Sequence, residues 1–268
     1  MHTKRPIHPS AGFGGTPDRL RRARALLEAK TEIQEVDAAA VPTLSGVDLA
    51  LRPGLHEWFS PETGSVWIPP LAVLIDLAHR ALAAFPGRPG GRAVVWIGRR
   101  CWPFPHALVG RDPAGGVGDR TLLTRSVFVD PPGRAERVWA MDLALRSPGV
   151  AAVVADGAGL AMPESRRLQL AASGAVGLLA RPDRERRELS AARTRWAVAP
   201  SRAHGAGQVW TVELLRCKGA QPTDGGVRRW AVRRDHATGA MDEWTACDVD
   251  LAPDVADRPA QTARARIA

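Results

Sequence analysis

The stretch Val150-Ala-Ala-Val-Val-Ala-Asp156 decides which fold class this sequence predicts. Its six apolar residues are too few to span a membrane, and polar residues do not alternate with them. An uninterrupted run of this length is typical of a strand buried on both faces, as in a parallel sheet covered by helices. Further strands are predicted at residues 55–59, 93–97, 126–129 and 175–179.

Helices are predicted between these strands, at residues 71–84, 135–146 and 164–172. In the first of them, apolar residues such as Leu74 and Leu82 share one face, while Asp76 lies on the opposite face. Short apolar strands that alternate with helices predict an α/β fold. We expect a mostly parallel central sheet with helices on both faces.

The alternation stops after residue 180. The next predicted strands, at 195–199, 209–215 and 228–233, are separated only by glycine-containing turns. Consecutive strands joined by turns pair antiparallel, so antiparallel C-terminal strands are expected to complete the sheet.

Composition divides the chain into segments. Thr16-Pro17-Asp18 has the cap residue, the proline and the acidic residue that are typical of a helix start. The expected segments are a flexible arm at 1–15, an N-terminal helix at 16–41, a linker at 42–54, a core domain at 55–245 and a flexible tail at 246–268.

The basic residues are unusual in kind and in distribution. The formal net charge is +9, yet only Lys4, Lys30 and Lys218 are lysines among 37 basic residues. Residues 160–234 carry 15 Arg and Lys against 6 Asp and Glu. Such a concentrated positive charge favours a polyanionic partner.

The sequence lacks features of secreted and membrane proteins. It has no run of 18 apolar residues and no apolar stretch near its first residues, so neither a membrane span nor a secretory signal is expected. Cys101, Cys217 and Cys247 lie far apart, which is typical of a reducing compartment. We therefore expect a cytoplasmic protein, including a fraction at the nucleoid.

Common catalytic and metal-binding motifs are missing from the sequence. HExxH, GxSxG and CxxC do not occur, and the seven histidines lack metal-ligand spacing. Gly157-Ala158-Gly159 begins like a dinucleotide-binding loop, but Met162 stands at the third glycine position. None of the three lysines stands in the Gly-Lys-Ser/Thr setting of a Walker A loop. We expect no catalytic residue, no metal and no cofactor.

Three parts of the chain resemble the ATPase core of RecA. The first is the order of strand 55–59, loop Pro61-Glu-Thr-Gly-Ser65 and helix. The second is the run 153–156, which resembles the RecA strand that ends in the Walker B aspartate, and the third is 211–219, which resembles a late strand of that core. More narrowly, the chain resembles the ImuA family, RecA-related bacterial proteins that accompany the polymerase-like ImuB in damage-induced mutagenesis. The segments that carry this resemblance are 54–57, 94–105, 168–172, 192–196 and 212–219, within a similar region of 16–245.

The resemblance implies a RecA-like core with a vestigial nucleotide site. Its expected remnants are Glu62, Thr63, Gly64, Ser65 and Asp156. The loop lysine is missing, and Arg99-Arg100 follow the strand after which RecA has its catalytic glutamate. Because phosphoryl transfer depends on positioning and electrostatic stabilisation of the phosphates, we expect a pseudo-ATPase and no enzyme. The alternative is a DNA-dependent ATPase or recombinase with an atypical nucleotide site.

In RecA-like proteins, the loops after the Walker B strand and after the next strand contact single-stranded DNA. The corresponding DNA-binding candidates here are Arg166, Arg167, Arg181, Arg184, Arg186, Arg187, Arg193 and Arg195. Clustered arginines bind phosphates in a salt-dependent manner, which also allows a plain DNA-binding module. The interspersed Asp183, Glu185 and Glu188 equally fit a solvated charged surface. Contact with a protein partner is a third interpretation.

The resemblance also implies an adaptor role in SOS-induced translesion DNA synthesis. The implied partners are an ImuB-like Y-family polymerase homologue, an error-prone DNA polymerase III alpha-type subunit, RecA and single-stranded DNA, with self-association through the N-terminal helix as an alternative to simple packing. The partner-docking candidates are Leu20, Leu27, Trp102 and Phe104. The segment around Trp102 fits either a rigid turn or a docking epitope. Three other tryptophans, Trp96, Trp139 and Trp210, lie in strand or helix patterns and are expected in the core.

Overall fold

The computed structural model describes residues 43–64, 66–84, 92–110, 118–201, 208–222, 228–234 and 244–246. The expected arm, the N-terminal helix with Leu20 and Leu27, and nearly all of the expected tail lie outside these residues. None of the described helices is long and apolar enough to cross a membrane.

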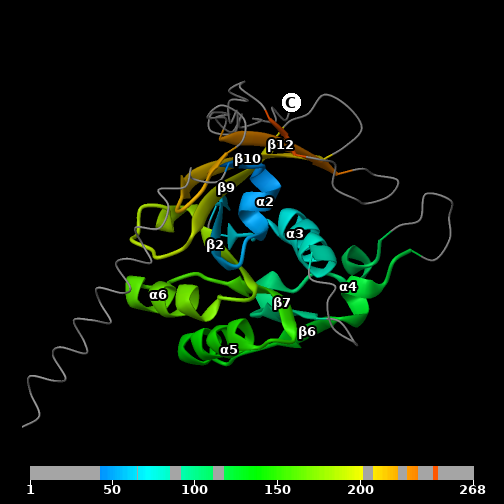
Figure 1. The fold of residues 1–268 in the computed structure, drawn as a ribbon, viewed down its shortest axis with the longest axis vertical. Coiled ribbons are helices and arrows are strands. Elements are labelled where there is room, and N and C mark those ends of the chain that lie inside the picture. Colours follow the sequence, from blue (N-terminus) through cyan, green and yellow to red (C-terminus); the bar gives the residue numbers. More distant parts are fainter. Residues whose placement is uncertain are drawn as a thin grey trace, which may run out of the picture. The chain divides into compact units, whose positions relative to one another are not determined.

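A single large sheet forms the centre of the described part of the chain (Figure 1). Its order is β13-β12-β10-β9-β2-β8-β7-β5-β6. The strands are β2 (Gly54–Ser60), β5 (Ala93–Ile97), β6 (Ser126–Val129), β7 (Val150–Asp156), β8 (Val176–Pro182), β9 (Thr194–Ser201), β10 (Gln208–Cys217), β12 (Arg229–Arg234) and β13 (Thr245–Ala246). Neighbours from β9 to β6 pair in parallel, whereas β10, β12 and β13 pair antiparallel. The predicted α/β class, the mostly parallel sheet and the antiparallel C-terminal strands are therefore confirmed, and the arrangement is consistent with a RecA-like core.

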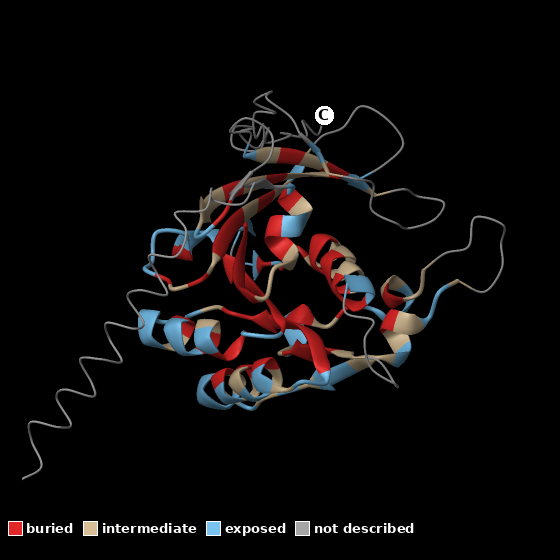
Figure 2. Ribbon diagram, viewed as in Figure 1, coloured by how far each residue is buried: buried red, intermediate tan, exposed pale blue. Residues whose placement is uncertain are grey.

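Helices cover both faces of the sheet. The helices are α2 (Gly46–Leu51), α3 (Leu71–Ala84), α4 (Thr121–Thr124), α5 (Arg134–Arg146) and α6 (Met162–Ala171). Helices α2 and α3 lie on one face, and α5 and α6 lie together on the other (Figure 1). Each face has its own apolar core, and Figure 2 shows the strands between them as buried, with exposed residues on the outer sides of α5 and α6.

Shorter elements connect the main ones. They are strands β1 (Thr43–Leu44) and β11 (Gln221–Pro222), the hairpin strands β3 (Glu62–Thr63) and β4 (Val66–Trp67), and the 3-10 turns η1 (Arg99–Cys101), η2 (Pro105–Leu108) and η3 (Asp183–Glu185). Strands β1 and β11 pair in parallel, and β3 and β4 pair antiparallel.

The prediction of a linker at 42–54 is wrong, because this segment contains β1 and α2. The side chain of Ser45 caps α2 by accepting a hydrogen bond from the Asp48 amide at 3.1 Å. Leu49 and Ala50 are buried in the core beneath the helix. A helix of six residues has too few turns to show a periodic pattern, so its tertiary contacts define it.

A cluster of four tryptophans fills the core on the α2 side, formed by Trp58, Trp196, Trp230 and Trp244. Trp196 contacts the other three, with ring-centroid distances of 5.2 Å to Trp58, 5.7 Å to Trp230 and 5.8 Å to Trp244. The rings of Trp58 and Trp196 are stacked with an interplanar angle of 5°, a favourable arrangement for aromatic pairs.

The expectations for the other tryptophans have different outcomes. Trp96 is buried, as predicted, and its indole N–H donates to Ser126 Oγ at 2.9 Å. Trp210 is half-buried against the core. Trp139 is 61% exposed on α5, so its predicted place in the core is wrong. It lies one turn from Leu143, which is also exposed on this helix.

Candidate functional site

The carboxyl ends of the parallel strands define the edge at which a RecA-like nucleotide site is expected. In open α/β sheets, ligands bind outside these strand ends. Here β2, β8, β7 and β5 are consecutive neighbours, so the residues that follow Ser60, Pro182, Asp156 and Ile97 meet at one edge.

A short β-hairpin occupies the loop after β2, where a phosphate-binding loop is expected. Strands β3 and β4 pair through Glu62 with Trp67 and through Thr63 with Val66, and Gly64 has a φ of 63° at the turn. Trp67 Nε1 donates to Ser60 Oγ at 2.9 Å, and that hydroxyl donates to the Ile68 carbonyl at 2.8 Å. The loop is therefore closed on itself by its own hydrogen bonds. Ser65, an expected remnant of the site, lies outside the described residues.

Asp156, at the end of β7, is almost completely buried and paired with two arginines. Its Oδ2 lies 3.2 Å from Arg100 Nη1 and 3.4 Å from Arg137 Nη1. Its Oδ1 accepts a hydrogen bond from the Ala158 amide at 3.0 Å. Two guanidinium groups thus surround the carboxylate that is expected to organise a metal–nucleotide complex, and they would repel a divalent cation at this point.

The two consecutive arginines after β5 have separate partners. Arg100 pairs with Asp156, whereas Arg99 lies 2.7 Å from Asp130 Oδ2, beyond the end of β6. Among the described residues, no group of three or more His, Cys, Asp and Glu side chains is arranged to hold a metal ion.

A buried ion-pair network lies beside this edge, which we call the Glu57 network. Glu57 accepts hydrogen bonds from Arg181 at 2.7 Å, from Ser190 at 2.8 Å and from Arg195 at 2.8 Å. Arg181 also donates to Glu185 at 2.8 Å. Burial lowers the pKa of Arg181, but Glu57 and Glu185 raise it above its ordinary value overall, so this guanidinium stays charged.

The Glu57 network connects the two loops that were expected to face DNA. Both carboxylate oxygens of Glu185 accept from the Gly159 amide, at 3.0 and 3.1 Å, in the loop after β7. Arg181 donates to the Leu160 carbonyl at 3.2 Å in the same loop. The loop after β7 is therefore held by two charged side chains, Arg181 at the end of β8 and Glu185 in η3.

Two of the DNA-binding candidates belong to this network and do not reach the surface. Arg181 is 0% exposed and Arg195 is buried, with its guanidinium 4.7 Å from the centre of the Phe59 ring. The prediction that these two arginines contact DNA is wrong, because neither guanidinium is accessible to a phosphate. In the sequence, Arg181 belongs to the same charged run as Arg184, Arg186 and Arg187, and only the position of Glu57 distinguishes it.

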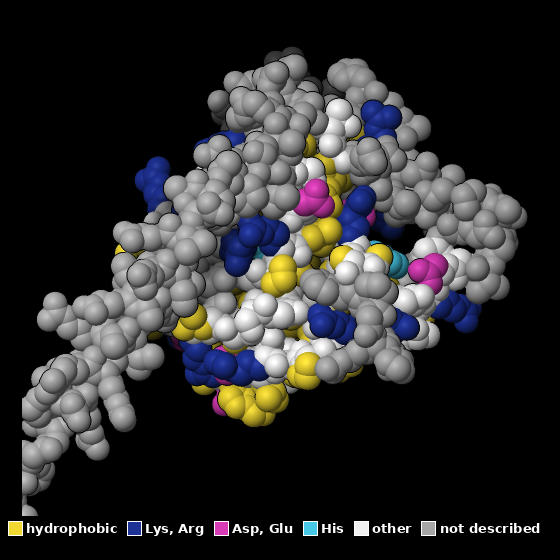
Figure 3. Space-filling view, in the orientation of Figure 1, with side chains coloured by type: hydrophobic (Ala, Val, Ile, Leu, Met, Phe, Trp, Pro, Cys, Tyr) yellow, Lys and Arg dark blue, Asp and Glu magenta, His cyan; other side chains and the backbone are white. Residues whose placement is uncertain are grey.

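The other candidates occupy several places. Arg184, Arg186 and Arg187 are exposed after β8, where Arg184 pairs with Glu62 and Arg186 lies 4.0 Å from Glu213. Arg166 and Arg167 are exposed on α6, and Arg193 precedes β9 at the opposite edge of the sheet. Figure 3 shows that Lys and Arg side chains lie in separate groups on the face of the molecule seen in that view. The structure therefore does not bring the predicted arginines into one patch.

Exposed apolar side chains gather around β6 and α5, and we call this region the β6–α5 surface. Val127 on β6, and Trp139 and Leu143 on α5, are exposed, and Phe128 is exposed on the opposite face of β6, where it contacts Trp96. A pocket of about 440 Å³ lies between α5 and the adjoining strands and is lined by both α5 residues. Strand β6 is the last strand of the described sheet, so its outer edge has no neighbouring strand there.

The docking candidates Trp102 and Phe104 follow η1, and Trp102 contacts Phe128 on the face of β6 that points away from α5. Phe104 is 83% exposed, while Trp102 is half-buried with its ring centroid 5.7 Å from that of Phe128. The Trp102 side chain therefore packs within the fold, whereas the Phe104 side chain is exposed at the surface.

Sequence reasoning did not single out the buried His56, which connects the tryptophan cluster to the amino end of β2. Its Nε2 donates to the Arg52 carbonyl at 2.7 Å, so its Nδ1 accepts from Thr194 Oγ1 at 2.6 Å. Thr194 in turn accepts from the Trp196 indole at 2.5 Å. Burial, together with the charges of Arg193 and Arg52, lowers the pKa of His56 to about 4, although its bond to the Arg52 carbonyl raises it.

The neutral His56 is expected to make stability depend on pH between about 6.5 and 4. The folded state disfavours protonation and the unfolded state does not, so stability falls as pH drops below the unfolded pKa. Acidification from pH 7.5 to 5 is expected to cost about 2 kcal/mol through this group, which urea unfolding at the two pH values measures. In His56→Gln the loss over the same range should be smaller by that amount. An equal loss in both proteins would contradict the role of His56.

Comparison with known proteins agrees with the predicted resemblance. The chain is 34% identical over 151 residues to Protein ImuA of Caulobacter vibrioides, in strain NA1000 / CB15N and in strain ATCC 19089 / CIP 103742 / CB 15. The matched region is 49% of this chain and 58% of the relative's length. No family model matches the chain. The similarity supports the suspected relation to the ImuA family, and the chain spans less than two thirds of these relatives.

Proposed function

We propose that this protein is a non-catalytic accessory protein of SOS-induced, error-prone translesion DNA synthesis, with a RecA-like core that serves as an adaptor. Its proposed partners are an ImuB-like protein and an error-prone polymerase. The observation that carries the non-catalytic part is the pairing of Asp156 with Arg100 and Arg137. The similarity to Protein ImuA supports the assignment to this pathway.

The charges at the carboxyl edge support the proposed absence of catalysis. Phosphoryl transfer requires cations to neutralise the phosphates and a carboxylate free to organise the metal. The loop after β2 has no lysine in the sequence, and the carboxylate of Asp156 is already neutralised by two arginines. The expected acid after β5 is replaced by Arg99 and Arg100. Each of these departures weakens nucleotide turnover independently of the others.

The adaptor role is supported by the β6–α5 surface. Exposed Trp139 and Leu143 beside a pocket, next to an edge strand, form the kind of apolar region that marks protein interaction sites. An edge strand also allows a partner to add a strand to the sheet. DNA contact is a separate possibility for Arg184, Arg186 and Arg187, which are exposed after β8.

The purified protein is expected to hydrolyse ATP no faster than the Asp156→Ala variant, with Mg²⁺ and single-stranded DNA present. RecA measured in the same assay provides the positive control. Turnover that requires Asp156 would contradict the proposal and favour the alternative, a DNA-dependent ATPase with an atypical site.

The adaptor role predicts co-purification with an ImuB-like protein from the same cells. Trp139→Ser combined with Leu143→Ser should reduce recovery of that partner at least about tenfold, since aromatic anchors dominate binding energy. Leu189→Ser is the matched control, because Leu189 is also exposed and lies elsewhere. Unchanged recovery with the double variant would reject this surface, and no recovery with the unaltered protein would reject the adaptor role.

A further inference from the structure

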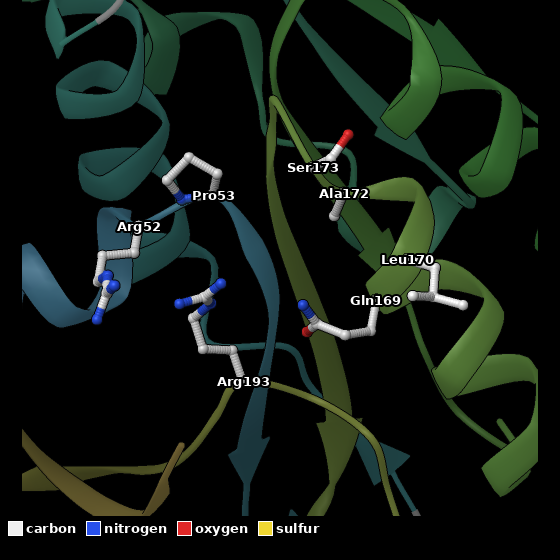
Figure 4. Close-up of a pocket in the computed structure, with 7 residues that line it drawn as sticks. All are labelled: Arg52, Pro53, Gln169, Leu170, Ala172, Ser173 and Arg193. Atoms are coloured by element: carbon white, nitrogen blue, oxygen red, sulfur yellow. The ribbon is translucent and has the colours of Figure 1, made fainter. Parts of the chain in front are cut away.

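A basic site lies at the amino end of β2, at the edge of the sheet opposite to Asp156. It is a pocket of about 430 Å³ between the end of α2, the end of α6 and the start of β9 (Figure 4). The lining residues are Arg52, Pro53, Gln169, Leu170, Ala172, Ser173 and Arg193. We call it the Arg52–Arg193 pocket.

The pocket contains two positive charges and no acidic side chain among the residues that line it. Arg193 Nε is buried without a hydrogen-bond partner in the described structure. Burial and the neighbouring Arg52 both lower the pKa of Arg193, which means that its charge is poorly compensated. Figure 4 shows the Arg193 guanidinium between the side chains of Arg52 and Gln169.

Nearby groups do not neutralise the positive charge of the two arginines. The carboxyl end of α6 lies at the pocket, and a helix end supplies only about half a negative charge. His56 below the pocket is neutral at physiological pH, since its pKa is about 4. Two guanidinium groups therefore face a cavity with a net positive charge.

The polar groups are fixed in position before any ligand arrives. Arg193 is held by its backbone, since its amide donates to the Leu55 carbonyl at 2.7 Å and its carbonyl accepts from the Lys218 amide at 2.9 Å. Arg52 Nη1 donates to the Gly219 carbonyl at 3.1 Å. Gln169 Oε1 accepts from the Leu55 amide at 3.0 Å, so its Nε2 is the end that can donate elsewhere.

Gly54 makes this arrangement possible. Its φ of 142° is accessible to glycine and rarely to other residues. A Cβ at this position would lie 2.7 Å from Arg193 Nε and 3.2 Å from Gln169 Nε2. The glycine thus allows both donors to approach the backbone at the floor of the pocket.

We infer that the Arg52–Arg193 pocket binds a phosphate monoester, carried either by a free nucleotide or by the 5′ end of a DNA strand. Guanidinium groups and an amide N–H supply donors only, and a phosphate offers acceptors only. The charge of a phosphate monoester at neutral pH, between −1.5 and −2, matches two arginines. A volume of about 430 Å³ lies within the usual range for small-molecule sites. The pocket is separate from the edge that contains Asp156, so ligand binding there does not depend on ATP hydrolysis.

Calorimetric titration at low ionic strength in a phosphate-free buffer tests this inference. Inorganic phosphate and AMP are expected to bind the full-length protein, and adenosine is not. Arg193→Gln should weaken AMP binding at least about tenfold, because it removes a charged hydrogen-bond donor. Arg120→Gln is the matched control, since it removes the same charge from an exposed position at the start of α4, outside the pocket, and it should leave AMP binding unchanged.

Further variants keep the test valid if Arg193→Gln does not fold. Arg52→Gln should also weaken AMP binding, because it removes the second positive charge of the pocket. A short DNA strand with a 5′-phosphate that binds more tightly than AMP identifies strand ends as the source of the phosphate. Tighter binding of AMP identifies free nucleotides, and both results support the site. Absence of phosphate and AMP binding, or equal affinity in Arg52→Gln, would overturn it.

Discussion

Arg181→Met is expected to lower the free energy of unfolding by about 3–5 kcal/mol. The side chain is completely buried and contacts Glu57, Glu185 and Glu188 at 2.7–2.8 Å. Removing it leaves the buried carboxylates of Glu57 and Glu185 with less compensating charge. Breaking one partner of a buried ion pair is costly for this reason, even where the intact pair adds little net stability. Urea unfolding followed by circular dichroism measures the effect.

Arg184→Met is the matched control for this prediction. Arg184 lies three residues further along the same charged run, but it is exposed and pairs with Glu62 at the surface. Exposed ion pairs contribute about 0–1 kcal/mol, so this variant should unfold close to the unaltered protein. Equal losses in the two variants would show that the Glu57 network does not hold the loops after β7 and β8.

Trp196→Ala is expected to cost about 3–5 kcal/mol of unfolding free energy. Trp196 is completely buried and contacts the three other tryptophans of the cluster. Its removal opens a cavity on the α2 side of the sheet and also deprives Thr194 of a hydrogen bond. Chemical denaturation gives the loss directly, and a lower tryptophan fluorescence is not by itself a measure of it.

Trp139→Ala tests whether the effect of Trp196→Ala comes from the size of the side chain or from its buried position. Both variants lose a tryptophan side chain, but Trp139 is 61% exposed on α5. Its loss should change stability by roughly 0.5 kcal/mol or less, as for most surface positions. A loss comparable to that of Trp196→Ala would contradict its exposed place on the β6–α5 surface.

The Glu57 network and the tryptophan cluster lie on opposite faces of β2. Glu57 directs its carboxylate to the ion network, while the next residue, Trp58, stacks on Trp196 in the tryptophan cluster. Successive side chains of a strand point to opposite faces, which explains how neighbours serve two environments. Strand β2 therefore connects the carboxyl-edge loops to the core beneath α2.

Most of the main elements could be predicted from local sequence. The predicted helix at 71–84 and the strands at 93–97 and 126–129 agree with α3, β5 and β6 in both bounds. Their apolar runs are long enough, and their boundaries are marked clearly enough, for periodicity to identify them. Helix α2 and the hairpin of β3 and β4 were missed because elements of a few residues carry no periodic signal.

The candidate site was predictable in its sequence positions and not in its environment. The run of arginines at 181–187 and the acid at 156 are visible in the chain itself. That Arg181 is buried while Arg184 is exposed depends on Glu57, which is 124 positions away from Arg181. The pairing of Arg100 and Arg137 with Asp156 is equally nonlocal.

By itself, the sequence determined the alternation of strands and helices, the excess of arginine in 160–234 and the lack of a Walker A lysine, because each is a local or countable property. Only the tertiary structure decided which arginines are buried, which tryptophans form the core, and that Arg52 and Arg193 share a pocket. These outcomes depend on the order of strands in the sheet. That order brings residues far apart in the chain within hydrogen-bonding distance, and charge and burial then select the pairs that stay together.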